Sequence, residues 1–290
     1  MCLLYWFKRV VRGALLCGLL LSQQAMAAEL ERTGGPYVPT PQVVVDEMLR
    51  MAKVGAGDFV VDLGSGDGVI VLTAAQRLKA RGFGVDIDPE LVKLSNSEAQ
   101  RLGIADRAQF YVQDVFKADI SRATVLTLYL LPGMMVNLRP KIFSELRPGT
   151  RVVSHDYHFD EWQHDEQFSF DVPEKEKING VPRATIYLWI VPAKIAGGWR
   201  IAVEGGEQYE ARLQQSYQKF EGTLNVGGRS AKLLQTALQG ESITFAIPVD
   251  NARQMFRGRI AGDKMEGTVE LGGGKRARWT ATRAAKTALR

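Results

Sequence analysis

The chain has 290 residues, of which 46% are hydrophobic and 24% charged, with 37 Lys and Arg against 32 Asp and Glu. This composition can bury a hydrophobic core, which excludes a disordered chain, a collagen-like chain and a small disulfide-rich protein. No hydrophobic run reaches the ~18 residues that a membrane-spanning helix needs, so a polytopic membrane protein is also excluded.

The first 27 residues have the pattern of a secretory signal peptide. Lys8, Arg9 and Arg12 precede a short hydrophobic stretch, and Ala25-Met26-Ala27 offers the small side chains that signal peptidase reads. We therefore predict cleavage after Ala27 and export to the periplasm, with an uncleaved N-terminal anchor as the alternative. Both cysteines of the chain fall within this segment, so the predicted mature chain contains no thiol and no disulfide.

Charge and sequence pattern both change near residue 195. Residues 28–192 hold 18 basic and 23 acidic side chains, whereas residues 193–290 hold 16 basic and 9 acidic ones. Gly197 and Gly198 are suited to a joint between domains. We predict a first domain over residues 28–195 and a second over residues 196–290.

The first domain alternates helix-like and strand-like segments. Thr40 and Pro41 suit the start of a helix that continues to Met51. Hydrophobic strands separated by helices of 10–15 residues predict an α/β fold with a mostly parallel sheet covered on both faces. The predicted helices are 41–51, 69–78 and 88–102, and the predicted strands are 59–61, 82–85, 109–112, 125–129, 151–154 and 184–191.

The second domain consists of short segments in which polar and hydrophobic residues alternate, separated by turns rich in Gly and Asp. This alternation is typical of half-buried antiparallel strands, and Gly262-Asp263 suits a hairpin turn. The pattern predicts a small all-β domain, either a barrel or a sandwich. The predicted strands are 199–203, 211–215, 223–226, 243–247, 255–260, 267–271 and 277–281.

The most informative segment for function is Asp62-Leu63-Gly64-Ser65-Gly66-Asp67-Gly68, between a predicted strand and a predicted helix. Its glycines let the backbone turn sharply beside a ligand, and the helix that follows presents unpaired N–H groups. Val69 stands where a dinucleotide fingerprint has its third glycine, which disfavours NAD. The Asp62 carboxylate would repel a pyrophosphate but would pair with an ammonium group of a ligand.

Two further carboxylates follow the next two predicted strands. Asp86 comes 20 residues after Gly66, at the end of a strand where a carboxylate can accept hydrogen bonds from both ribose hydroxyls. Asp114 follows the next strand, where an adenine amino group would lie. An ammonium group, a ribose and an adenine together describe S-adenosylmethionine, although a helix cap or a solvated turn is the better explanation of each aspartate taken alone.

Short segments between Tyr37 and Trp162 match one group of enzymes. They are Tyr37-Val38-Pro39-Thr40-Pro41, Asp62–Gly68, Gly84-Val85-Asp86-Ile87, Leu128-Tyr129-Leu130-Leu131-Pro132, Met134-Met135 and Ser154-His155-Asp156. On these segments the chain resembles class I S-adenosylmethionine-dependent methyltransferases. It is most similar to the branch that contains protein-lysine methyltransferases of mitochondria and their bacterial relatives.

The resemblance implies a Rossmann-like seven-stranded sheet that binds S-adenosylmethionine. The methionine end of the cofactor would lie against Asp62, Gly64, Ser65, Gly66, Asp67 and Gly68. Its ribose would lie at Asp86 and its adenine near Asp114. Ile87 and Val115 would cover the two faces of the base. Tyr129 and Tyr37 are the candidates for orienting the methyl acceptor, with packed aromatic residues as the alternative explanation of both.

The acceptor itself is expected to be a lysine of a protein. Enzymes that methylate adenine or glutamine amides carry an Asn/Asp-Pro-Pro-Tyr/Phe element after the fourth strand, where this chain has residues 127–132. The weak positive charge of the mature chain also disfavours nucleic acid. A small-molecule methyltransferase and an exported, non-catalytic binding module that keeps the fold are the alternatives.

Two other clusters stand out in the sequence. His155, His158 and His164 lie among aspartates, a pattern that resembles a divalent-metal site. The sequence contains no HExxH helix, so we predict that no metal binds here. We predict instead that these residues form a partly hydrated loop that lines the acceptor cleft. The C-terminal residues Lys275, Arg276, Arg278, Arg283, Lys286 and Arg290 suggest a weak contact with an anionic surface, with a solvated strand edge and tail as the alternative.

Overall fold

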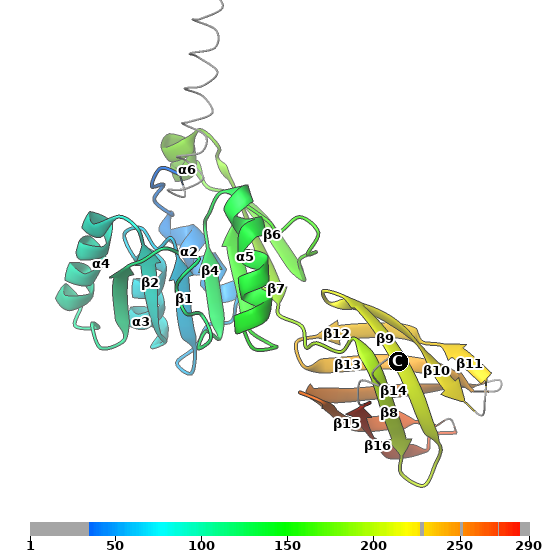
Figure 1. Cartoon of the computed structure of the whole chain (residues 1–290). Coiled ribbons are helices and arrows are strands. Elements are labelled where there is room, and N and C mark those ends of the chain that lie inside the picture. Colours follow the sequence, from blue (N-terminus) through cyan, green and yellow to red (C-terminus); the bar gives the residue numbers. More distant parts are fainter. Residues whose placement is uncertain (1–34, 227–228, 250–251, 272, 285–290) are drawn as a thin grey trace, which may run out of the picture. The chain divides into compact units, whose positions relative to one another are not determined.

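The computed structural model describes residues 35–226, 229–249, 252–271 and 273–284 (Figure 1). The predicted signal peptide lies outside the described residues. The chain divides into two compact units: residues up to Asp119 with Leu126–Lys141 and Val153–Tyr187, and the remaining segments with Leu188–Arg290. Among the described residues, no helix combines the length and the hydrophobicity needed to cross a membrane.

The first sheet has seven strands in the order β3-β2-β1-β4-β5-β7-β6. Strands β1, β2 and β3 are parallel, with Asp62 of β1 opposite Gly84 of β2. The chain order changes direction at β1, and ligands of open α/β sheets bind where the order reverses. The strands are β1 Phe59–Leu63, β2 Arg81–Asp86, β3 Ala108–Val112, β4 Val125–Leu128, β5 Arg151–His155, β6 Glu166–Asp171 and β7 Arg183–Ile190.

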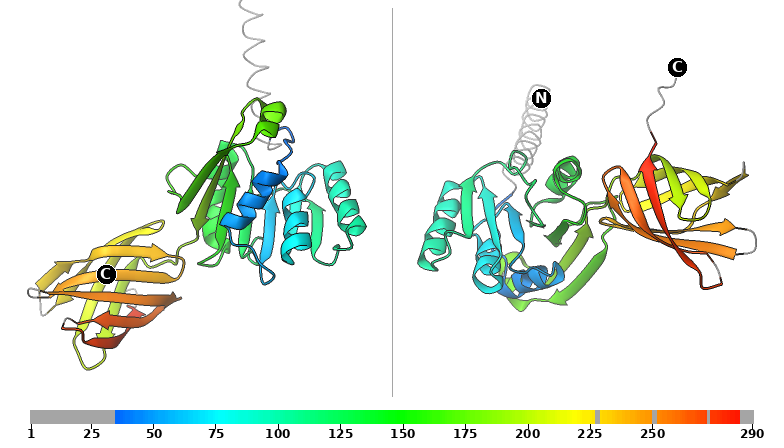
Figure 2. Two further views of the ribbon diagram at one scale, coloured as in Figure 1. Left: turned by 180° about the vertical axis from the view of Figure 1, so that it is seen from behind. Right: turned by 90° about the horizontal axis from the view of Figure 1, so that it is seen from below.

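Helices cover both faces of this sheet, as predicted. Helix α5 lies on one face, and α2 and α3 lie on the other (Figures 1 and 2); α4 packs against β2 and β3. Asp88 caps α4, because its carboxylate accepts hydrogen bonds from the first-turn N–H groups of Glu90 and Leu91. The helices are α2 Gln42–Met51, α3 Val69–Leu78, α4 Pro89–Arg101, α5 Pro132–Glu145 and α6 Pro173–Asn179.

Three elements of this part were not predicted. Helix α5 contains Pro140, and prolines usually end helices. Strand β6 is an edge strand without a fully buried residue, so it lacks a hydrophobic pattern. Helix α6, with the sequence PEKEKIN, has the composition of a solvated loop. The Rossmann-like seven-stranded α/β fold that the sequence predicts is nevertheless confirmed.

The second sheet has nine antiparallel strands in the order β11-β10-β9-β8-β16-β15-β14-β13-β12. Its two ends approach each other, since β10 contacts β12 and β11 contacts β13. The strands are β8 Gly197–Val203, β9 Gln208–Ser216, β10 Lys219–Val226, β11 Arg229–Lys232, β12 Leu234–Gln239, β13 Ser242–Val249, β14 Ala252–Ala261, β15 Lys264–Glu270 and β16 Arg276–Arg283.

This near-barrel confirms the predicted all-β domain and adds β11 and β12, which the sequence pattern did not reveal. Its core is aromatic: Phe245 stacks on Phe256 at 4.8 Å between ring centroids, and Trp279 packs edge-on against both rings. The hairpin predicted at Gly262-Asp263 joins β14 to β15, and Ala261 pairs with Lys264 across it.

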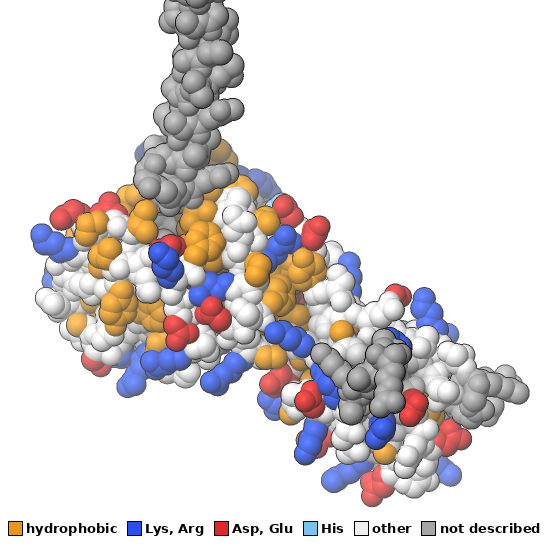
Figure 3. Space-filling view, in the orientation of Figure 1, with side chains coloured by type: hydrophobic (Ala, Val, Ile, Leu, Met, Phe, Trp, Pro, Cys, Tyr) orange, Lys and Arg blue, Asp and Glu red, His pale blue; other side chains and the backbone are white. Residues whose placement is uncertain are grey.

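The basic residues of β16 are partly neutralised by acidic residues of the same domain. On the face of the molecule that Figure 3 shows, basic and acidic side chains are interspersed. Arg276 lies 3.3 Å from the Glu270 carboxylate, and Arg283 pairs with Asp263 while its guanidinium lies 4.4 Å from the centre of the Trp199 ring. Lys286 and Arg290 lie outside the described residues. Contact of this stretch with an anionic surface stays a prediction.

Candidate active site

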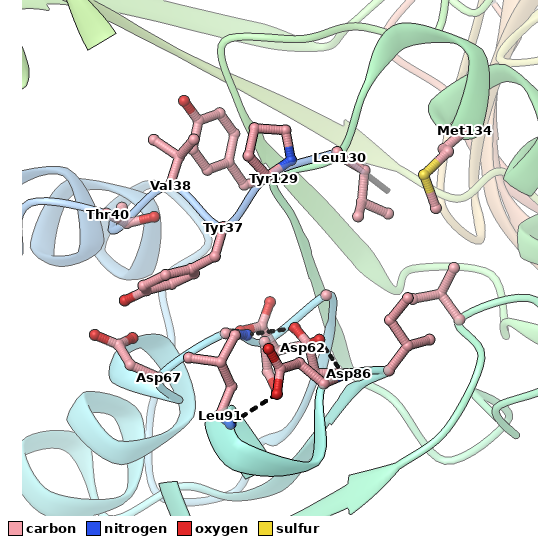
Figure 4. Close-up of a pocket in the computed structure, with 18 of the residues that line it drawn as sticks. Tyr37, Val38, Thr40, Asp62, Asp67, Asp86, Leu91, Tyr129, Leu130 and Met134 are labelled. Atoms are coloured by element: carbon pink, nitrogen blue, oxygen red, sulfur yellow. Dashed lines mark hydrogen bonds between the residues drawn. The ribbon is translucent and has the colours of Figure 1, made fainter. Parts of the chain in front are cut away.

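A cavity of about 660 Å³ opens at the carboxyl ends of β1, β2 and β4 (Figure 4). This volume falls in the range of sites for small molecules and cofactors. All the predicted site residues except Gly68 line it: Tyr37, Asp62, Gly64, Ser65, Gly66, Asp67, Asp86, Ile87, Asp114, Val115 and Tyr129. The fold therefore brings together side chains that are spread over more than ninety residues of the sequence.

The glycines of the loop after β1 are required by its geometry. Gly64 and Gly66 have positive φ angles of 78° and 52°, and a Cβ atom at Gly66 would lie 2.6 Å from the Tyr37 ring. Gly68, at a φ of 79°, lies behind the cavity, where a Cβ atom would collide with Phe110. Gly68 therefore supports the loop and does not line the cavity.

Asp62 is the most buried carboxylate of the cavity, with 2% of its surface exposed. The Thr127 hydroxyl of β4 donates a hydrogen bond of 2.7 Å to its Oδ1 atom. Burial raises the pKa of Asp62 to about 7, and the nearby charges of Asp86 and Asp67 act in the same direction. A cationic group of a ligand would stabilise the ionised form of this carboxyl.

Asp86 and Asp114 are held by backbone N–H groups at the ends of β2 and β3. The Asp86 carboxylate accepts hydrogen bonds from Gly66, at 2.8 Å, and from Asp88, at 3.0 Å, so it fixes the glycine loop against β2. The Asp114 carboxylate accepts a hydrogen bond of 2.9 Å from the N–H of Phe116. Both carboxylates thus keep a fixed orientation in the cavity.

The donors and acceptors of the cavity fit an aminoacyl nucleoside. Asp62 suits an ammonium group, and Asp86 suits a ribose diol. The Ser65 hydroxyl is buried beside Gly84 of β2 and makes no hydrogen bond to any other described residue. Ile87 and Val115 offer hydrophobic surface on the Asp86 and Asp114 side, where a base would lie.

Tyr37 belongs to the glycine-loop side of the cavity. Its hydroxyl is hydrogen-bonded to the Asp67 carboxylate, and its pKa is raised, first by burial and then by the charge of Asp67. Figure 4 shows its side chain reaching across the loop toward Asp67. Tyr37 thus shapes the predicted cofactor pocket.

Tyr129 follows β4 and lines the cavity on the side away from Asp86 (Figure 4). Its ring packs on the His155 ring at 4.1 Å between centroids and stacks on Tyr157 at 6.1 Å. Its hydroxyl is hydrogen-bonded by the Asn179 side chain, and burial raises its pKa to about 12. Tyr157 and Asn179 also line the cavity; we call Tyr129, Tyr157 and Asn179 the acceptor end.

Sequence reasoning missed Thr127, Tyr157 and Asn179. Thr127 stands in the segment that differs from the Asn-Pro-Pro-Tyr pattern, but nothing in that segment marks it as a partner of Asp62. The local sequence marks neither Tyr157 nor Asn179, because only the chain path after β5 and through α6 brings them to Tyr129.

The three histidines do not converge. His155 ends β5 and has 1% of its surface exposed, so the predicted partly hydrated loop is wrong at this residue. The rings of His158 and His164 pack on Tyr187, with centroids 5.7 and 5.2 Å away. None of the three lines the cavity. The described residues hold no group of three or more His, Cys, Asp and Glu able to bind a metal ion.

Comparison with known proteins agrees with this geometry. The sequence model of the ANTKMT methyltransferase domain matches residues 62–166. A protein-lysine N-methyltransferase of Saccharolobus islandicus is 39% identical over 54% of this chain and 93% of its own length. The adenine nucleotide translocase lysine N-methyltransferase of Mus musculus is 33% identical over 44% of this chain and 56% of its own length.

A solved structure of an RNA methyltransferase from Salinibacter ruber, in complex with S-adenosyl-L-homocysteine, is 47% identical with a TM-score of 0.49; the alignment covers 55% of this chain and 96% of that one. The family match begins at Asp62 and includes the glycine loop, Asp86, Asp114 and Tyr129. Because the relative from Saccharolobus islandicus is 39% identical and is covered over 93% of its length, the chain belongs to the S-adenosylmethionine-dependent methyltransferases.

Proposed function

We propose that this enzyme N-methylates a lysine side chain of a protein. The observation that carries the proposal is the acceptor end of the cavity, where Tyr129 lies away from Asp86 (Figure 4) and contacts Tyr157 and Asn179. Two of the three relatives named above are lysine N-methyltransferases, which supports a lysine acceptor, while the third is named an RNA methyltransferase. The acceptor protein is defined only by its chemistry, an accessible lysine.

The charge of the cavity suits two cationic partners. Asp62, Asp67, Asp86 and Asp114 line it, and a cleft lined by one sign of charge concentrates ligands of the opposite sign. Both the sulfonium cofactor and a lysine ammonium group are positively charged. The same acidic lining would repel the phosphates of RNA.

In the proposed reaction, the lysine nitrogen forms a bond to the methyl carbon while the bond between that carbon and sulfur breaks. Bound S-adenosylmethionine supplies the activated methyl group. The chain itself aligns the two reactants, which provides most of the rate enhancement in such a displacement. The carboxylates and the glycine loop hold the cofactor side, and the acceptor end holds the amine.

The lysine must lose a proton to water before it attacks. Leu130, Leu131 and Met134 also line the cavity, and desolvation by such hydrophobic walls lowers the pKa of an ammonium group. The Tyr129 hydroxyl oxygen then accepts an N–H of the neutral amine, so that the nitrogen lone pair points toward the methyl group. Tyr129 is thus the proposed catalytic residue, and Tyr37 closes the cofactor side.

Incubation of the protein with S-adenosylmethionine labelled in the methyl group, together with a periplasmic extract, tests the proposal. Mass spectrometry should find the label on lysine Nζ atoms. Label on RNA or on a small molecule would replace the proposed acceptor. Binding of S-adenosylhomocysteine without any transfer would favour the non-catalytic binding module.

We also propose that the enzyme acts after export. The support is the signal-peptide pattern of residues 1–27 and the absence of cysteine from the rest of the sequence. N-terminal sequencing of the protein from its native host should start at Ala28. An intact Met1 would contradict cleavage.

A further inference from the structure

Three ionisable side chains, two of them buried and one partly buried, lie next to the acceptor end and take no part in the reaction described above. They are His155, Asp156 and Lys175, and Lys175 has only 2% of its surface exposed. Lysine is almost never fully buried unless its charge is paired. The Lys175 Nζ atom lies 2.6 Å from Asp156 Oδ2 and also donates a hydrogen bond to the carbonyl of Arg183.

Asp156 joins this ion pair to the end of the sheet. Its Oδ1 atom accepts a hydrogen bond of 3.0 Å from the backbone N–H of Thr185 in β7. Its own backbone has a φ angle of 63°, which is uncommon outside glycine. The carboxylate is therefore fixed on one side by β7 and on the other by Lys175 of α6.

His155 lies between this ion pair and Tyr129. Its Nε2 atom is 3.5 Å from Asp156 Oδ2, and neither ring nitrogen makes a hydrogen bond within the part of the chain that the structure describes. Burial lowers the pKa of His155 to about 4, and the charge of Lys175 lowers it further, although Asp156 opposes both. A neutral imidazole thus forms the surface on which the Tyr129 ring rests, at 4.1 Å.

Helix α6 also contacts Tyr129 from the side. Lys175 and Asn179 are four residues apart, so they lie on the same face of the helix. The Asn179 Oδ1 atom accepts a hydrogen bond of 3.1 Å from the N–H of Val181, which turns its amide NH₂ group toward the Tyr129 hydroxyl. The helix that Lys175 anchors therefore supplies the hydrogen-bond partner of Tyr129.

We infer that Lys175, Asp156 and His155 form a positioning network that holds Tyr129 and Asn179 in place for the methyl acceptor. The inference rests on the proposed function of Tyr129. The network residues do not line the cavity, so they act through Tyr129 and Asn179. Because Asp62, Asp86 and Asp114 belong to other elements, the network should influence methyl transfer and leave cofactor binding unchanged.

The charges of the network make a diagnostic test possible. The groups that face His155 are Asp156, Lys175, Tyr129 and Tyr157, from β5, α6 and the segments that follow β4 and β5. Replacement of Lys175 by Met leaves the Asp156 carboxylate unpaired next to the imidazole, which favours the protonated form of His155. Asp156→Asn in the same chain removes that charge and keeps an acceptor for Thr185.

The experiment compares Lys175→Met, the double variant Lys175→Met/Asp156→Asn and the control Lys177→Met, a change at an exposed position of the same helix. We expect Lys175→Met to lower kcat by about 10- to 100-fold, the range expected for misplaced reacting groups. The kcat of this variant should also fall as the pH is lowered through neutrality, which that of the wild type should not do. Its dissociation constant for S-adenosylhomocysteine should equal that of the wild type. The double variant should recover most of kcat.

Proton NMR separates the network from the proposed function, because the chain has only three histidines. The His155 resonance should titrate at higher pH in Lys175→Met than in the wild type, whether or not a lysine substrate has been found. Should Lys175→Met fail to fold, Asn179→Ala at the exposed end of α6 tests the same alignment, with loss of kcat expected. Two results would overturn the inference. One is an unchanged kcat in both Lys175→Met and Asn179→Ala; the other is a double variant whose kcat is no higher than that of Lys175→Met, together with a His155 pKa that does not change.

Discussion

The Thr127 hydroxyl donates a hydrogen bond of 2.7 Å to the Asp62 carboxylate, which has 2% of its surface exposed. This pair joins β1 to β4 at the point where the strand order reverses. It places an acid whose pKa is raised to about 7 on the wall of the cofactor pocket. Binding of a cationic ligand at this wall is therefore linked to the ionisation of Asp62.

Cofactor affinity should depend on pH because of this carboxyl. Below pH 7 the free enzyme holds a proton on Asp62 that the ammonium group of the ligand must displace, so affinity should fall by about tenfold for each pH unit. Calorimetry with S-adenosylhomocysteine in two buffers of different ionisation enthalpy should detect about one proton released at pH 6. The Asp62→Asn variant should bind S-adenosylhomocysteine more weakly than the wild type above pH 7, and its affinity should not depend on pH in this range. A wild-type affinity that is constant from pH 6 to pH 8 would contradict the account.

The stability of the α/β part should show two opposing pH effects. The pKa of His155 is lowered to about 4 in the folded chain, so this group stabilises the fold above pH 6.5 and loses that contribution, about 3 kcal/mol, as the pH falls to 4. The raised pKa of Asp62 acts in the opposite direction, since the folded chain binds its proton more tightly between pH 4 and pH 7.

Single variants should separate these effects. Urea unfolding of Asp62→Asn should give a free energy of unfolding that falls on acidification from pH 6.5 to pH 4.5, because only the His155 effect remains. His155→Gln should show the reverse slope, and the wild type a shallow one. Equal slopes in all three proteins would show that neither group titrates as described.

Gly66→Ala should impair cofactor binding through Tyr37. The new Cβ atom would lie 2.6 Å from the Tyr37 ring, at a φ of 52°, so we expect the dissociation constant for S-adenosylhomocysteine to rise by at least tenfold. Gly103→Ala is the matched control, because Gly103 has a φ of 68° and no atom within 4 Å of its added Cβ. It should cost only about 1 kcal/mol of stability and leave binding unchanged.

The same substitution in a Tyr37→Ala background tests the cause. Without the ring, Gly66→Ala should have a smaller effect on binding than it has in the wild type. Additive effects of the two substitutions would show that the ring and the loop do not interact.

Removal of the Tyr129 hydroxyl should lower kcat and not cofactor affinity. Tyr129→Phe loses the hydrogen bond from Asn179 and the proposed contact with the acceptor, so we expect kcat to fall by about 10- to 100-fold. Tyr111→Phe is the control, since Tyr111 is exposed on β3 and its hydroxyl bonds to Gln109. A Tyr129→Phe enzyme with wild-type kcat would remove Tyr129 from the reaction.

Much of the cofactor side could be predicted from the sequence for a physical reason. Asp62 and Asp86 lie at the carboxyl ends of β1 and β2, and Asp114 lies two residues after β3; parallel strands bring their carboxyl ends to one edge of the sheet. The local pattern therefore determines both the position and the chemistry of these residues.

The acceptor end could not be predicted in the same way. Lys175 is one charge among several in the sequence PEKEKIN, yet it is buried because a carboxylate 19 residues earlier lies 2.6 Å away. His155 resembles part of a hydrated histidine loop, but its position at the end of β5 buries it. Such pairings depend on the tertiary path of the chain, which hydrophobic periodicity does not encode.

The central claim is that Tyr129 presents a protein lysine to a methyl group held at Asp62 and the glycine loop. Mass spectrometry of peptides after incubation with S-adenosylmethionine carrying a deuterated methyl group measures this directly. The account predicts deuterated methyl groups on lysine Nζ atoms with the wild type and at least tenfold less with Tyr129→Phe. Cofactor binding with label on RNA, or with no labelled lysine at all, would contradict it.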